Sequence, residues 1–103
     1  MAEITVNGKN IILNDEGYLT DMNQWDEAVA KELAKQDGID LTEDHMKVLN
    51  YLREKYAAGE SLTIRKVGKS GIVDIKGLYK LFPGGPLKLS SKYAGIPKPT
   101  SCV

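Results

Sequence analysis

The sequence predicts an α+β, mostly helical fold: an N-terminal β-hairpin, a small helical bundle and an extended C-terminal arm. A strong Asn-Gly turn signal lies between two short apolar segments near the N-terminus. Two longer stretches have helical apolar spacing, and all four prolines fall in the last 21 residues. A chain of 103 residues fits one folded domain. We therefore expect a globular domain over residues 1–82 and a flexible arm over residues 83–103.

The hairpin comes first. Ile4 and Val6 alternate with polar neighbours, and apolar residues return over positions 11–13. Between them, Asn7-Gly8 suits a two-residue turn whose central residues both need a positive φ.

Two longer helices follow, at about 24–36 and 43–57. Asn23 is the expected cap of the first helix, and Thr42 is the expected cap of the second. Each helix is followed closely by a glycine that favours its end. The apolar faces are expected to hold Trp25, Ala28, Val29 and Leu33, and then Val48, Leu49, Leu52 and Tyr56.

Residues 61–82 predict two short helices that are broken near Ser70-Gly71. After Phe82 the composition changes, because the prolines join three glycines and acidic residues are absent. Proline removes backbone donors and opposes helix formation, so we expect an extended or irregular segment there. The apolar faces of the two short helices are expected to hold Leu62, Ile64 and Val67, and then Ile75, Leu78, Tyr79 and Phe82.

Charge is unevenly distributed, although the formal net charge is zero. Residues 1–60 hold 13 acidic and 6 basic side chains, whereas residues 61–103 hold one acidic and 8 basic side chains. Either the two halves attract each other, or the basic half meets an acidic partner or a nucleic acid. The sequence has no apolar run of about 20 residues and no signal-peptide pattern. We expect a cytoplasmic monomer that does not contact the membrane.

Few side chains could carry chemistry. One histidine and one cysteine provide no metal-ligand cluster, and the glycines match neither a Walker loop nor a dinucleotide fingerprint. We therefore expect no metal and no cofactor. His45 lies in the first turn of a helix with no nucleophile near it in sequence, which predicts an ordinary structural residue.

Cys102 is the candidate nucleophile. A packing cysteine is normally buried, whereas this one lies at the end of a proline-rich tail. Its position alone leaves an incidental and a functional role equally open. A tail of 21 residues could reach about 70 Å, and its last ten residues about 30 Å. Such reach suits a carrier that enters another protein's cleft better than an enzyme with its own substrate pocket.

The segment LFPGGPLKLSSKYAGIPKPTSCV at 81–103 resembles the C-terminal signature of the DsrC/TusE/DsvC sulfur-relay family, approximately LFPxGPxKxxCKxAGLPKPTGCV. The likeness extends to QWDEAVA at 24–30, LTEDH at 41–45 and YLREKY at 51–56. Arg65 in TIRKV resembles the Ile-Arg element of the family.

The resemblance implies a small domain with a helix-turn-helix-like portion and an arm whose Cys102 carries sulfane sulfur as a persulfide. It implies a TusBCD/DsrEFH-like sulfurtransferase complex as donor. The acceptor would be a tRNA 2-thiouridylase in the TusE branch or the dissimilatory sulfite reductase in the DsrC branch. We expect Lys88, Lys92 and Lys98, with Arg65, to contact these partners.

This sequence departs from the DsrC pattern at one decisive position in the arm. Ser91 stands where that branch has its second arm cysteine, so two-thiol chemistry within one chain is excluded. Ser101 replaces the usual glycine. A single-thiol relay remains, as in the TusE branch. The alternative is a single-cysteine paralogue that acts as a sulfite reductase-associated subunit, or a DNA-binding regulator that uses residues 61–82.

Overall fold

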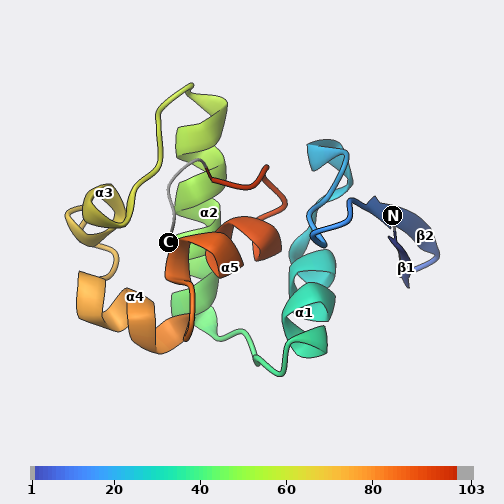
Figure 1. The fold of residues 1–103 in the computed structure, drawn as a ribbon, viewed down its shortest axis with the longest axis horizontal. Coiled ribbons are helices and arrows are strands. Elements are labelled where there is room, and N and C mark those ends of the chain that lie inside the picture. Colours follow the sequence, from blue (N-terminus) through green and yellow to red (C-terminus); the bar gives the residue numbers. More distant parts are fainter. Residues whose placement is uncertain (1, 100–103) are drawn as a thin grey trace.

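The computed structural model describes residues 2–99, which form a two-stranded sheet and a set of short helices (Figure 1). In chain order the elements are β1 (Ala2–Val6), β2 (Lys9–Leu13), the 3-10 helix η1 (Met22–Gln24), α1 (Glu27–Gln36), α2 (Glu43–Ala57), α3 (Ile64–Gly68), α4 (Ile75–Leu81) and α5 (Pro86–Tyr93). The hairpin lies beside α1 at one end, and α3 and α4 lie at the other.

The hairpin forms as predicted. The strands pair antiparallel with Ile4 opposite Ile11, and the turn residues Asn7 and Gly8 have φ values of 50° and 80°. Positive φ at both central positions gives the turn a twist that matches the flanking strands. Val6 and Ile11 are buried, and β1 contacts α1. A two-stranded sheet is marginal by itself, so this contact with the helix stabilises it.

Helix α1 begins later than the sequence predicts. Asp26 is its N-cap, and the Asp26 carboxylate accepts a hydrogen bond of 2.9 Å from the backbone N–H of Val29. The predicted cap Asn23 lies instead in η1, and Trp25 has an extended backbone. The reason is competition between caps. Asp26 satisfies an unpaired N–H of α1, and this leaves Trp25 outside the helix.

Helix α2 has the predicted bounds, and its first turn explains the single histidine. Thr42 and His45 form a capping box in which His45 Nδ1 accepts from the Thr42 N–H at 3.0 Å. His45 Nε2 lies 2.8 Å from the carbonyl oxygen of Leu81, and the ring packs edge-on against Phe82. The imidazole thus joins α2 to the end of α4, and its role is structural.

The break between α3 and α4 also lies where the sequence predicts it. Val67, Leu78 and Phe82 are fully buried, but Ile75 and Tyr79 are 45% and 46% exposed. The predicted apolar face of α4 is therefore too wide. Such a short helix packs along one seam, and the side chains that flank this seam stay in solvent.

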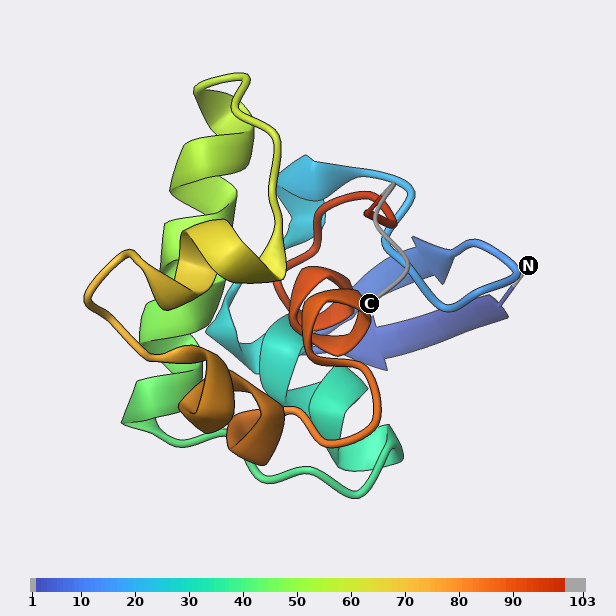
Figure 2. The same ribbon diagram turned by 60° about the vertical axis from the view of Figure 1, so that its left-hand side comes forward.

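Helix α5 is the main departure from the predicted fold. An extended or irregular conformation is wrong for residues 86–93, which form a helix between α1 and α2 (Figures 1 and 2). Pro86 occupies the first helical turn, where proline is tolerated because its missing N–H would be unpaired there anyway. Leu87, Tyr93 and Ile96 are fully buried. Proline content does not exclude this helix, because Pro86 lies in its first turn and the other three prolines lie outside it.

The predicted fold class is confirmed: the chain is mostly helical, with one N-terminal hairpin. Of the helices within residues 2–99, none has the length and apolar character needed to cross a membrane. The core runs from the hairpin through α1 and α2 to α4, and α5 completes it. The folded body therefore continues past residue 82, at least to Ile96.

A chain cut after residue 82 should fail to fold cooperatively. It would lose three fully buried large side chains, Leu87, Tyr93 and Ile96, each worth about 1.5–3 kcal/mol. A domain of this size has only about 5–15 kcal/mol of net stability. Far-UV circular dichroism on heating should show no sigmoidal transition for residues 1–82 and a clear one for residues 1–99. Matching transitions in the two chains would contradict a structural role for α5.

Candidate functional site

The predicted nucleophile, Cys102, lies outside the described residues. The structure instead describes the base of the arm, where the chain leaves α5 at Ala94 and runs past Ile96 to Pro99. Of the residues 2–99 that the structure describes, none belongs to a group of three or more His, Cys, Asp or Glu side chains arranged to hold a metal ion. The site is therefore built from the contacts that hold this base and from the pocket beside it.

Two side chains from separate elements cap the last turn of α5. Trp25 Nε1 donates to the carbonyl oxygen of Tyr93 at 2.7 Å, and Arg53 Nη1 donates to that of Ala94 at 2.8 Å. The guanidinium of Arg53 also lies over the Trp25 ring, 4.4 Å from its centre. Burial lowers the pKa of Arg53 from its usual value. Carbonyls at a helix end need such donors, so these contacts fix where the arm begins.

Gly95 makes the turn that follows α5. Its φ is +71°, a conformation that side chains disfavour. A Cβ atom added there would lie 2.6 Å from Leu19 Cδ1 and 2.6 Å from Trp25 Cδ1. The backbone of Gly95 therefore passes directly against these two side chains, and only glycine fits without displacing them.

A third set of contacts attaches α5 to α1. The Tyr93 hydroxyl donates to Asp37 Oδ2 at 2.8 Å, and Lys92 Nζ lies 3.0 Å from the same oxygen. Burial, followed by the hydrogen bond and the charge of Asp37, raises the pKa of Tyr93 well above its ordinary range. In the loop that follows β2, the Tyr18 hydroxyl donates to the Lys88 carbonyl oxygen at 3.1 Å.

The four predicted partner-binding cations do not form one cluster. Lys92 pairs with Asp37, and Lys98 Nζ pairs with Glu16 Oε2 at 2.6 Å. Lys88 on α5 and Arg65 on α3 are exposed and form no ion pair with another of residues 2–99. Exposed pairs contribute little to stability, so the Lys98 pair can open at small cost when a partner approaches.

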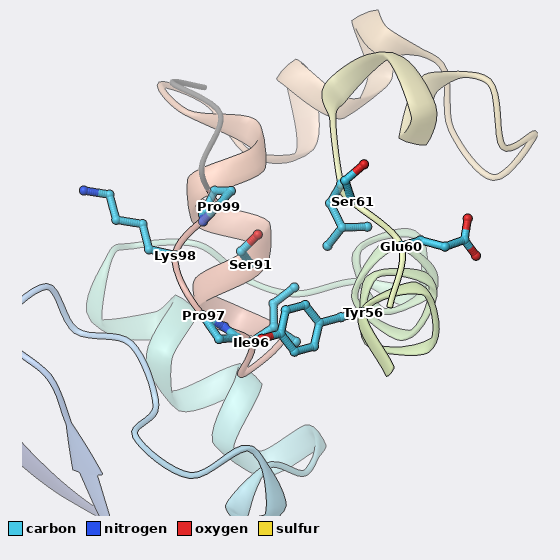
Figure 3. A pocket seen from close by; sticks show the side chains of 9 residues that line it. Tyr56, Glu60, Ser61, Ser91, Ile96, Pro97, Lys98 and Pro99 are labelled. Carbon is cyan, nitrogen blue, oxygen red and sulfur yellow. The ribbon is translucent and has the colours of Figure 1, made fainter. Parts of the chain in front are cut away.

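A pocket of about 250 Å³ lies between the arm and the C-terminal end of α2 (Figure 3). Figure 3 shows Lys98 and Glu60 pointing outward on opposite sides of it. Ser91 is fully buried at its wall, and its Oγ has no hydrogen-bond partner among the described residues. The lining residues are Tyr56, Glu60, Ser61, Leu62, Ser91, Ile96, Pro97, Lys98 and Pro99.

Sequence reasoning missed the residues that hold the arm. The sequence predicts a helix face for Trp25 and no separate role for Arg53. One signal was available for Arg53, since it lies four residues after Leu49 and so borders the apolar face of α2. A cation at that position needs polar partners from elsewhere in the fold. Nothing in the sequence identifies Tyr93 O and Ala94 O as the acceptors for Trp25 and Arg53.

Replacing Gly95 by alanine should cost more stability than replacing Gly84 by alanine. Both glycines have positive φ, +71° and +91°, so the backbone penalty is shared. A Cβ at Gly84 meets no described atom within 4 Å, whereas one at Gly95 collides with Leu19 and Trp25. Overpacking of this kind costs about 1–3 kcal/mol beyond the backbone term. Urea unfolding of the two variants measures the difference, and equal losses would show that the close approach at Gly95 is unimportant.

Comparison with known proteins agrees with this geometry. Residues 5–103 match the family described as DsrC like protein. The chain is 42% identical to "Sulfurtransferase TusE" of Pectobacterium atrosepticum, covering 93% of this chain and 95% of that one. It is 35% identical to "Sulfite reductase, dissimilatory-type subunit gamma" of Nitratidesulfovibrio vulgaris, over the full length of both.

The structure is similar to the solved structure of DsrC from Allochromatium vinosum, with a TM-score of 0.83 and 42% sequence identity. That alignment covers 98% of this chain and 97% of the other. The likeness in fold therefore extends across the hairpin, the bundle and α5. Together with the sequence match over almost the whole chain, it shows that the protein belongs to the DsrC-like family of sulfur-relay proteins.

Proposed function

We propose that this protein is a sulfur carrier, in which Cys102 accepts a sulfane sulfur as a persulfide and passes it to a downstream acceptor. The observation that carries the proposal is family membership together with a single cysteine on the arm that leaves α5. Relatives named TusE sulfurtransferase and sulfite reductase subunit gamma support a role in sulfur transfer.

The proposed transfer needs no external oxidant. The Cys102 thiolate attacks the terminal sulfur of a donor persulfide, R–S–SH. The donor S–S bond breaks, R–S⁻ leaves, and Cys102–S–SH forms with the proton still on the transferred sulfur. In the second step an acceptor nucleophile attacks that terminal sulfur, and the Cys102 thiolate is regenerated. Because the thiolate is the reactive species, the rate of this step depends on how strongly the partner's cleft favours the deprotonated form of the thiol.

The single cysteine limits the proposed transfer to one thiol per chain. Ser91 stands where the DsrC signature has its second arm cysteine, and a hydroxyl cannot join a disulfide or trisulfide. The proposed chemistry is therefore a one-thiol transfer, as in the TusE branch. The proposed donor is a TusBCD/DsrEFH-like sulfurtransferase complex. The proposed acceptor is a tRNA 2-thiouridylase, with the dissimilatory sulfite reductase as the second candidate, and the relay works in the cytoplasm, where thiols stay reduced.

The working arm is shorter than composition suggests. Because Ile96 is fully buried, we place the start of the swinging segment after it rather than after Phe82. Cys102 is six residues beyond Ile96, a reach of about 20 Å when extended. That length is enough for the thiol to enter a partner's cleft while Trp25 and Arg53 hold the end of α5. These contacts fix the point from which the arm extends, and the partner's cleft provides the surroundings in which the thiol reacts.

A DNA-binding regulator is the alternative function, and the geometry of α3 and α4 supports it less well. The helices that would read DNA, α3 and α4, have only five and seven residues. The exposed side chains of α4 include Ile75 and Tyr79, which are poor readers of base edges. The nearby lysines suit a protein partner with an acidic surface equally well.

Incubation with a persulfide donor should add about 32 Da to the intact mass, the mass of one sulfur atom. The Cys102→Ala variant should gain nothing, because the only cysteine of the chain is then absent. Intact-protein mass spectrometry measures both, and a reductant should reverse the addition. Failure of the native protein to take up sulfur from a low-molecular-weight persulfide and from a persulfidated sulfurtransferase would rule out the carrier function.

Reversal of charge at Lys88 should slow sulfur uptake from the donor protein. Lys88 is exposed on α5 without an ion pair to another of residues 2–99, so Lys88→Glu should lower the second-order rate constant several-fold at low salt. Added salt should shrink the difference, because it screens long-range attraction. Lys31→Glu, an exposed change on α1, serves as the control. Equal uptake rates for the two variants would show that the face of α5 around Lys88 does not contact the donor protein.

A further inference from the structure

Exposed apolar side chains gather around α4. Five large apolar or aromatic side chains among residues 2–99 are exposed, and three of them, Ile72, Ile75 and Tyr79, lie within eight consecutive positions. Ile75 and Tyr79 are 45% and 46% exposed, and their spacing of four residues puts them on one side of α4. A single exposed apolar residue is ordinary, whereas a group of them on one element is typical of a surface that another protein covers.

Two lysines lie next to this apolar pair. Lys76 and Lys80 are exposed and are also four residues apart, so helix geometry places them about 100° further round α4 than the apolar pair. Neither lysine forms an ion pair with another of residues 2–99. Asp74 is the one acidic side chain of residues 61–103, and it caps α4 by accepting a backbone N–H at 2.6 Å. No carboxylate of α4 itself therefore compensates the two positive charges.

A pocket of about 420 Å³ lies on the other side of the lysines. Gly77 and Leu81 each follow one of the lysines in the sequence, so they lie about 100° beyond them. The lining residues are Asp44 of α2 and Ile72, Val73, Gly77, Lys80 and Leu81 of the α4 region. The exposed surface of α4 thus presents a row of two lysines with apolar surface on both sides.

This pattern fits a protein better than a nucleic acid. Lysines attract carboxylates and phosphates alike, so the charge by itself does not distinguish the two. Protein interfaces combine apolar contacts with a charged rim, whereas a phosphate backbone offers no apolar group to cover Ile75 and Tyr79. Apart from its two lysines, α4 has no side chain of the kinds that pair with base edges.

We propose that the exposed face of α4, formed by Ile72, Ile75, Lys76, Tyr79 and Lys80, is the surface on which the sulfur donor protein docks. The matching surface of the donor would present carboxylates between apolar side chains. Helix α4 contacts α5, which carries the arm, and it lies far from the hairpin (Figure 1). This inference rests on the proposed sulfur relay and adds that affinity for the donor comes from the folded body, while the arm supplies the thiol.

The first experiment compares sulfur uptake from a persulfidated TusBCD/DsrEFH-like complex with uptake from free cysteine persulfide. The double variant Lys76→Glu, Lys80→Glu should react about tenfold more slowly with the complex at low salt, because attraction becomes repulsion. It should react with cysteine persulfide at the native rate, since that step needs no docking. The double variant Lys31→Glu, Lys35→Glu places the same change four residues apart on exposed α1 positions and should behave as native. Equal rates for the two double variants would overturn the proposal.

The apolar contact is tested by Ile75→Ser, with Ile12→Ser in the hairpin as the matched control at 38% exposure. Circular dichroism checks that both variants are folded. Uptake from the complex should fall about fivefold for Ile75→Ser only, and the difference should persist at high salt, because salt screens charges but leaves apolar burial intact. An unchanged rate for Ile75→Ser would overturn the proposal.

Two other occupants of the α4 face give different results. If the face binds nucleic acid, Lys76→Glu, Lys80→Glu should abolish binding to duplex DNA or tRNA and leave uptake from the complex unchanged. If the face binds the acceptor, the same variant should slow only delivery of sulfur to the tRNA 2-thiouridylase. Either result would overturn docking of the donor.

The second experiment separates docking from sulfur chemistry. Cys102→Ala cannot carry sulfur, yet it should bind the donor complex with close to native affinity in isothermal titration calorimetry, because the α4 face is intact. Adding Lys76→Glu and Lys80→Glu to this chain should weaken binding about tenfold. Failure of Cys102→Ala to bind would overturn the docking face even where the native chain loads sulfur. Binding by Cys102→Ala, with no sulfur uptake by the native chain from either donor, would instead reject the carrier function and keep the docking face.

Discussion

The structure depends on the burial of α5 between α1 and α2. Leu87, Tyr93 and Ile96 bring apolar area that the hairpin and the other helices cannot supply by themselves, and a small domain has little stability to spare. The same helix carries the arm. Folding of the body therefore also fixes the base of the arm, since the last turn of α5 is capped by Trp25 and Arg53.

The contacts along the end of the chain differ before and after Ile96. The base of the arm is fixed by two donors to helix-end carbonyls, by the close approach at Gly95 and by the contacts of Tyr93 with Asp37. Within residues 97–99 the contacts are of another kind, and Lys98 forms an exposed ion pair with Glu16. Exposed pairs contribute little free energy, so Lys98 is held more weakly than the base of the arm.

Local signals in the sequence determined the hairpin, α2 and the break between α3 and α4. The Asn7-Gly8 turn and the Thr42 cap depend only on residues that are close to them in the sequence. The arm motif and Cys102 were also visible in the sequence, and with them the family. Tertiary structure alone decided that residues 86–93 are helical, because that helix is stabilised by burial against α1 and α2 and not by its own propensity. It also decided the roles of Trp25 and Arg53, whose partners on α5 lie far from them in the sequence.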